Sequence, residues 1–224
     1  MTTHMHREIS RLKDTLLELS AEVEKSISCA GRALENFDEN LACEIITNDS
    51  RINDLEVNIE EDCLKIFALY QPVAHDLRTV VAILKINNDL ERMADLAVNI
   101  CRYMMKIKEQ GIVPVSANFQ PMFEACLKMV RKCLDAFMRE DITLAAEVCE
   151  MDNIVDELNV KIISEIQEEL GNGSSSGPIN STLFMLSLCR TVERIADYAT
   201  NIAEDVYYMV SGKIIRHQAD ILVK

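Results

Sequence analysis

Apolar residues recur along this chain every three or four positions, in long stretches separated by short polar or proline-containing breaks. This spacing places them on one face of an α-helix and differs from the alternation of a β-strand. In the first stretch the apolar face consists of Ile9, Leu12, Leu16, Leu19, Val23 and Ile27. The pattern predicts six long amphipathic helices, over about residues 5–36, 39–70, 74–110, 118–139, 142–170 and 180–210.

Proline and glycine mark several of the predicted helix ends. Pro72 separates the second helix from the third, because proline has no N–H to donate and clashes with the preceding helical turn. Gly111 and Pro114 end the third helix, and Gly212 ends the sixth. The low-complexity stretch GNGSSSGP at residues 171–178 predicts a flexible loop.

An internal repeat divides the six predicted helices into two sets of three. Residues 91–100 read ERMADLAVNI and residues 193–202 read ERIADYATNI, with seven of ten positions identical. Upstream, DSRINDL at residues 49–55 matches DNIVDEL at residues 152–158, at almost the same offset. A duplication explains both matches, so we expect an all-α protein of two tandem antiparallel three-helix bundles. The two bundles are expected over residues 1–112 and 113–224.

Composition and charge narrow the class of function. The chain of 224 residues is 49% hydrophobic, which is ordinary for a globular protein, and its formal net charge is −14. This charge would repel a phosphate backbone, so we expect no nucleic-acid partner. It suits cations or basic patches on other proteins, although solubility alone also accounts for it. No membrane helix or signal peptide is expected, which predicts a cytoplasmic protein.

Eight cysteines are scattered along the chain without any C-x-x-C pair. They are Cys29, Cys43, Cys63, Cys101, Cys126, Cys133, Cys149 and Cys189. Nearly all fall at apolar helical positions, which predicts reduced thiols that fill the core in a reducing compartment.

Carboxylates follow a regular spacing on the third and sixth predicted helices. Glu91, Asp95 and Asn99 are four residues apart, so they form one stripe away from the apolar face of their helix. That apolar face is expected to consist of Leu90, Met93, Ala94, Ala97, Ile100, Cys101 and Met104. The second copy of the stripe is Glu193, Asp197, Asn201 and Glu204.

The second and fifth predicted helices carry partner rows of acids and amides. The rows are Asp49, Asn53, Glu56 and Glu60 in the first copy and Asp152, Asp156 and Asn159 in the second. Antiparallel helices joined across Pro72 bring the Asp49 row near the Glu91 row. Clustered carboxylates beside amide oxygens are ligands for hard or borderline divalent cations. A solvated acidic face is the competing interpretation for any single row.

The sequence predicts no catalytic set. It contains no Gly-rich phosphate loop, no G-x-S-x-G elbow and no Cys/His pair of defined spacing. The E-x-x-H pair of di-iron bundles is also absent. The four histidines show no ligand spacing with one another, at His4, His6, His75 and His217.

Several of these segments together resemble the PhoU family, bacterial regulators of phosphate transport and of the phosphate-starvation response. They are EISRLK at residues 8–13, the acidic segment from Asp49 to Glu56, QPVAHDLR at residues 71–78, the two ER-x-A-D copies and GKIIRH at residues 212–217. The resemblance covers almost the whole chain. It implies two three-helix bundles and multinuclear metal sites, reported with Fe, Zn, Mn or Mg, at E/D-x-x-x-D motifs.

Carried over position by position, the resemblance implies metal ligands in both repeats. They are Asp49, Glu91 and Asp95 in the first repeat and Asp152, Asp156, Glu193 and Asp197 in the second. Asn53 departs from the pattern, because the matching Asp156 is acidic. A neutral oxygen at this position implies weaker binding, or fewer ions, in the first site.

The resemblance also implies a function. PhoU-like proteins restrain phosphate uptake and signalling when phosphate is plentiful, through contacts with the ATPase of a phosphate ABC transporter and with a phosphate-sensing histidine kinase. A homodimer is also expected. The competing hypotheses are a metal-dependent phosphate-ester hydrolase, a metal-storage bundle and a scaffold with solvated acidic faces.

Overall fold

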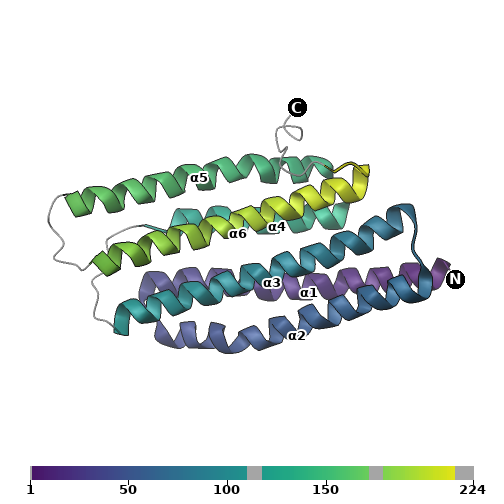
Figure 1. The fold of residues 1–224 in the computed structure, drawn as a ribbon, viewed down its shortest axis with the longest axis horizontal. Helices are drawn as coiled ribbons and strands as arrows, with labels where there is room; N and C mark the ends of the chain where they lie inside the picture. The colour runs from purple at the N-terminus through teal and green to yellow at the C-terminus, as the bar shows by residue number, and fades with distance from the viewer. Residues whose placement is uncertain (1, 110–117, 172–178, 215–224) are drawn as a thin grey trace.

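The computed structural model describes residues 2–109, 118–171 and 179–214. In these residues the chain forms six helices: α1 (Thr2–Asn36), α2 (Glu39–Tyr70), α3 (Ala74–Glu109), α4 (Gln120–Arg139), α5 (Ile142–Gly171) and α6 (Ile179–Ser211). All lie roughly along one long axis (Figure 1). The predicted all-α class and its six helices are confirmed. The expected boundary between residues 112 and 113 lies outside the described residues, as do residues 172–178 of the loop expected at 171–178, whereas Gly171 is the last residue of α5.

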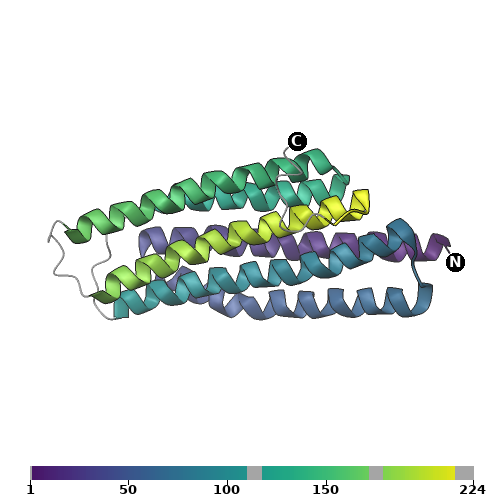
Figure 2. The same ribbon diagram turned by 45° about the horizontal axis from the view of Figure 1, so that its top comes forward.

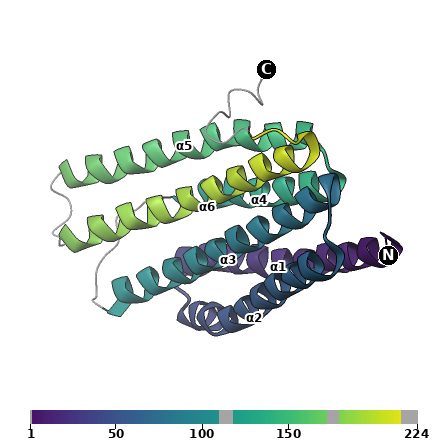
Figure 3. The ribbon, with the colours of Figure 1, turned by 45° about the vertical axis from the view of Figure 1, so that its right-hand side comes forward.

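The helices pack as two sets of three that meet through equivalent members. Within each set every helix contacts the other two, and across the sets α1 packs against α4 and α3 against α6. In Figures 2 and 3, α3 and α6 lie side by side through the middle and run in opposite directions, with α2 and α5 at opposite edges. None of the described helices is both long and apolar enough to cross a membrane.

The short connections α1–α2 and α4–α5 are built alike. Phe37 and Glu140 follow the first helix of each pair with left-handed backbones, at φ 51° and 54°. The next residues, Asp38 and Asp141, begin the following helices. The Asp38 carboxylate accepts a hydrogen bond from a backbone N–H in the first turn of α2 at 3.1 Å. Asp141 accepts two in the first turn of α5, at 2.8 and 3.2 Å. The duplication therefore extends to the capping of the helices.

The apolar faces predicted for the first and third helices are buried along their full length. Burying one such aliphatic side chain stabilises the fold by about 1.5–3 kcal/mol. All eight cysteines are free thiols; six are buried, whereas Cys29 is half-buried and Cys43 is exposed. Burial raises the pKa of Cys63 and Cys101 to about 12, so these thiols stay protonated at neutral pH.

Polar contacts fix one end of the α3–α6 interface. Lys85 of α3 forms an ion pair with Asp205 of α6, which is only 7% exposed. The Lys85 Nζ also lies 5.7 Å from the centre of the Tyr208 ring. Nearby, Arg78 Nε donates to the backbone carbonyl of Met209 at 2.9 Å. Because the last carbonyls of a helix lack partners within it, Arg78 stabilises the C-terminal end of α6.

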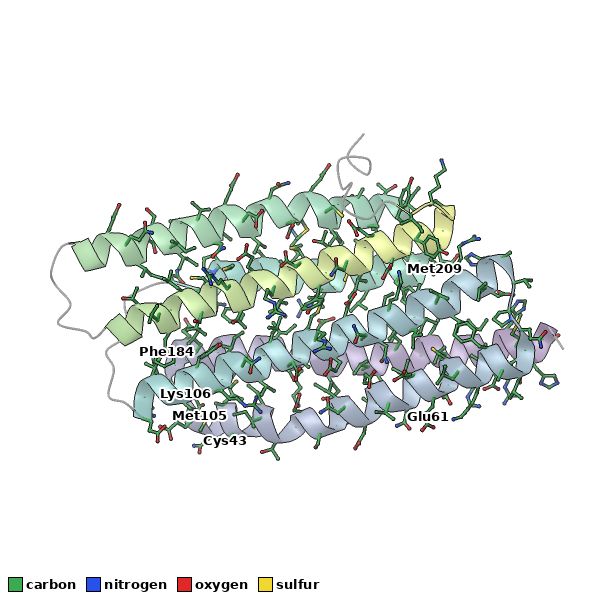
Figure 4. All side chains as sticks on the ribbon, viewed as in Figure 1. Cys43, Glu61, Met105, Lys106, Phe184 and Met209 are labelled. Carbon is green, nitrogen blue, oxygen red and sulfur yellow. The ribbon has the colours of Figure 1, made fainter. Side chains whose placement is uncertain are left out.

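Apolar contacts complete the joint between the two sets. At the far end of α6 from Met209, Phe184 packs against Tyr103 of α3 with ring centres 6.3 Å apart (Figure 4). Between α1 and α4, Gly31 lies so close to Phe123 that a Cβ atom at residue 31 would come within 3.1 Å of the ring. A side chain at residue 31 would therefore push against the Phe123 ring.

Candidate metal centres

The acid rows of α2 and α3 form a first cluster, which we define as Asp49, Glu56, Glu91 and Asp95. Burial, followed by the nearby Asp95 carboxylate, raises the pKa of Asp49, while an arginine and a hydrogen bond from Asn53 lower it. Burial and the charge of Asp95 likewise raise the pKa of Glu91, with smaller contributions from Glu56 and Asp49. Carboxylates on two helices therefore repel one another across the α2–α3 seam.

The rows of α5 and α6 form a second cluster, which we define as Asp152, Asp156, Glu193 and Asp197. Burial raises the pKa of Asp152 to about 6, helped by the charges of the other three carboxylates. Burial and the charges of Asp197 and Asp156 raise the pKa of Glu193, and a hydrogen bond from Asn159 lowers it. Burial and Asp156 also raise the pKa of Asp197. This cluster concentrates charge as the first one does.

All seven residues expected as metal ligands fall in these two clusters, three in the first and four in the second. Their charges act on one another across the helix pairs. However, among the described residues no three His, Cys, Asp or Glu side chains are arranged so that they could hold a metal ion. Their role as ligands therefore stays a prediction.

Several buried oxygen atoms at the clusters lack hydrogen-bond partners, which bears on whether a cation can bind there. Asp49 Oδ1, Asn87 Oδ1 and Asn159 Oδ1 are buried and have no hydrogen-bond partner in the described part of the chain. An unpartnered buried oxygen costs free energy that a bound cation can recover. Carboxylate and amide oxygens are the ligands that Mg²⁺, Mn²⁺ and Ca²⁺ prefer. The type and charge of the donors therefore fit a hard cation.

Two buried amides connect the paired helices. Asn87 of α3 is fully buried, and its Nδ2 donates to the Glu56 backbone carbonyl at 3.0 Å and to Glu56 Oε1 at 3.2 Å. In the second half, Asn159 Nδ2 donates to Glu193 Oε2 at 2.9 Å. Sequence reasoning missed Asn87. Its signal was a polar residue on the otherwise apolar face that holds Ile83 and Leu90.

Arg92 and His6 each lie close to a carboxylate. Arg92 Nε lies 3.6 Å from an oxygen of its neighbour Glu91. The imidazole of His6 lies 3.3 Å from a carboxylate oxygen of Asp76, outside both clusters.

Two matched trios of helices, each carrying one cluster of four carboxylates, define a duplicated helical-bundle protein. A family profile described as the PhoU domain matches residues 16–104 and 119–206, once in each half. The chain belongs to the PhoU family of phosphate transport accessory and regulatory proteins, which are regulators and not enzymes. The predicted family and the two bundles are thereby confirmed.

Relatives in several bacteria are similar over nearly their whole length. The phosphate-specific transport system accessory protein PhoU homolog 1 of Thermotoga maritima is 33% identical over 216 residues, covering 95% of this chain and 92% of the relative. The PhoU accessory protein of Escherichia coli is 33% identical over 210 residues, with coverages of 94% and 86%.

Two solved structures have the same fold. The crystal structure of PhoU from Pseudomonas aeruginosa matches with a TM-score of 0.84 at 33% identity, over 93% of this chain and 99% of that one. The phosphate transport system regulatory protein PhoU from Streptococcus pneumoniae matches with a TM-score of 0.84 at 28% identity, over 94% and 98%.

Proposed function

We propose that this chain restrains phosphate uptake and phosphate-starvation signalling in the cytoplasm when phosphate is plentiful. The relatives from Thermotoga maritima and Escherichia coli are named as accessory proteins of the phosphate-specific transport system, and the match runs over nearly their full length. The proposed partners are the ATPase of a phosphate ABC transporter and a phosphate-sensing histidine kinase. The net charge of −14 supports docking to basic surfaces on such proteins.

The observation that carries this proposal is the pair of acid clusters, one in each half. In the proposal the first cluster binds metal ions through Asp49, Glu91 and Asp95. The second cluster uses Asp152, Asp156, Glu193 and Asp197. A bound cation supplies positive charge that neutralises the mutual repulsion of these carboxylates. Of Fe, Zn, Mn and Mg, the all-oxygen donor set suits Mg, Mn and Fe better than Zn, which prefers nitrogen and sulfur ligands.

Affinity capture from cells grown with ample phosphate tests the proposed partners. The wild-type chain is expected to retain the transporter ATPase and the histidine kinase. The double variant Asp95→Asn/Asp197→Asn, with one nearly isosteric change in each cluster, is expected to retain much less of both. The matched control is Asp54→Asn/Glu157→Gln, since these acids are exposed and lie outside the clusters.

Two results would count against the proposal in different ways. Failure of the wild-type chain to retain either protein would contradict the regulatory role. Equal capture by the cluster variant and its control would show that the clusters are not needed for binding these partners. The expected homodimer stays a prediction, which light scattering on the purified chain can check.

A further inference from the structure

The α3–α6 seam, where these two helices meet, contains a groove of about 480 Å³, which we call the acidic groove. Its polar lining consists of three carboxylates, two exposed amides and one lysine: Asp89, Glu204, Asp205, Asn88, Asn201 and Lys85. The lysine already pairs with Asp205. The groove therefore keeps an excess of negative charge.

The matching part of the same seam carries the opposite charge. In the alignment of the two repeats, Glu204 corresponds to Arg102 and Asn88 corresponds to Arg190. The other two carboxylates of the groove correspond to a tyrosine and a threonine, which carry no charge at neutral pH. After the duplication, one part of the seam has therefore become acidic and its counterpart basic.

Arg102 and Arg190, which we call the arginine pair, are both exposed. They lie towards the end of the seam where Tyr103 packs against Phe184, with ring centres 6.3 Å apart. Lys106, one turn further along α3, is also exposed and lies at this end (Figure 4). In the described part of the chain neither arginine forms an ion pair, although each places positive charge beside one acid cluster.

Two regions of opposite charge on one seam restrict what can dock there. At a rise of 1.5 Å per residue, Asn88 at the groove and Arg102 lie about 20 Å apart along α3. A basic side chain of a partner suits the carboxylates of the groove, and carboxylates of a partner suit the exposed guanidinium groups. A uniformly basic partner would meet repulsion at the arginine pair, so this pair adds specificity that the net charge of the chain does not supply.

We infer that the α3–α6 seam is the docking surface for the transporter ATPase, which presents a basic side chain to the acidic groove and an acidic patch to the arginine pair. This rests on the proposed regulatory function and adds to it the surface and the direction of docking. The direction is fixed because an ATPase turned end to end would bring like charges together at both places.

Titration of the full chain with the purified transporter ATPase tests the arginine pair, with the Kd measured by calorimetry at one fixed salt concentration. Arg102→Glu/Arg190→Glu is expected to raise the Kd by about tenfold or more, because attraction becomes repulsion. The matched control Arg7→Glu/Arg32→Glu makes the same change of charge on exposed residues of α1. It is expected to shift the Kd by less than about threefold.

The acidic groove is tested separately by Asn88→Lys/Asn201→Lys. This variant adds two positive charges at exposed positions of the groove and leaves its carboxylates and its ion pair in place. The Kd is again expected to rise by about tenfold or more. The matched control Asn36→Lys/Asn40→Lys adds the same charge at exposed positions near the α1–α2 connection and is expected to shift the Kd by less than about threefold.

Thermal unfolding checks that all four variants are folded, so that a loss of binding reports on the surface. Equal Kd values for each seam variant and its control would overturn the inference while the regulatory function stands. Loss of affinity at only one end of the seam would also overturn it, since the inference requires complementary charge at both ends. If the wild-type chain does not bind the ATPase, the proposed contact with the transporter fails and the inference fails with it.

Discussion

Glu140 shows how a single side chain can join the two halves of the molecule. One carboxylate oxygen lies 3.1 Å from Lys13 Nζ of α1, and the other lies 3.3 Å from His75 Nε2 of α3. Partial burial raises its pKa, but the hydrogen bonds and charges of Lys13 and His75 outweigh burial and leave the pKa below its usual 4.5. The ionised form of Glu140 therefore stabilises the folded state.

The lowered pKa predicts a pH-dependent effect of Glu140→Gln. A carboxyl group whose pKa is lower in the folded state contributes stability above its unfolded pKa, and that contribution is lost as pH falls through the folded value. At pH 7 the variant is expected to lose about 0.5 kcal/mol of unfolding free energy, because the pair is partly exposed to solvent. At acidic pH, below the lowered pKa of the folded state, the difference from wild type is expected to vanish.

Urea titrations at both pH values measure this difference. Asp135→Asn, at an exposed acid on α4, the helix that precedes Glu140, is the control and is expected to change little at either pH. A loss of equal size at neutral and acidic pH would show that the effect does not come from the charge of Glu140.

At the scale of the elements, the matched corners determine where α2 and α5 begin. Phe37 and Glu140 hold left-handed backbones, which cost about 1 kcal/mol for a residue with a side chain. The carboxylates of Asp38 and Asp141 offset this cost by accepting hydrogen bonds from N–H groups that would otherwise lack partners. The same device at matching positions keeps each helix pair antiparallel.

Removal of a cap should destabilise its helix pair. Asp141→Ala is expected to lower the unfolding free energy by about 1 kcal/mol, since two backbone donors of α5 lose their acceptor. Asp141→Asn keeps a side-chain oxygen and is expected to remain near wild type. Thermal unfolding followed by circular dichroism compares the three proteins, and an unchanged midpoint for Asp141→Ala would contradict the role of the cap.

Helix positions were predictable because each depends on local spacing and on a few residues that end helices. Pro72 was expected to interrupt the chain between two helices, and Gly212 was expected to end the last one. In the structure the N–H of Gly212, a residue at φ 72°, donates to the backbone carbonyl of Tyr208 at the end of α6. The acid rows were equally visible from their four-residue spacing. In contrast, the hydrogen bond from Asn87 to Glu56 joins residues far apart in the sequence, so no spacing rule could reveal it.

At the scale of the whole molecule, the α3–α6 interface makes one body of two halves. Its polar end is the ion pair between Lys85 and the nearly buried Asp205, and nearby Arg78 of α3 donates to a carbonyl in the last turn of α6. No periodicity within a helix predicts this pairing, because the packing of separate helices sets it. A buried carboxylate that loses its cation costs far more than a pair on the surface.

The high cost of leaving a buried carboxylate unpaired predicts the outcome of a double-mutant cycle on Lys85 and Asp205. Lys85→Ala is expected to cost about 2 kcal/mol of unfolding free energy, because it leaves the Asp205 carboxylate buried without its cation. Adding Asp205→Asn is expected to recover part of that loss by removing the charge. Chemical denaturation of the four proteins gives the coupling energy. Additive effects of the two changes would mean that the pair does not join the halves.

The meeting of α1 with α4 and of α3 with α6, each pair antiparallel, has a consequence for the origin of the fold. Equivalent surfaces that face each other in opposite directions are the arrangement of an isologous, two-fold interface. A single ancestral trio of helices could meet a second copy of itself through the same surfaces. Fusion of such a homodimer into one gene would free each half to change alone, as the exchanged acid and amide on α2 and α5 already show.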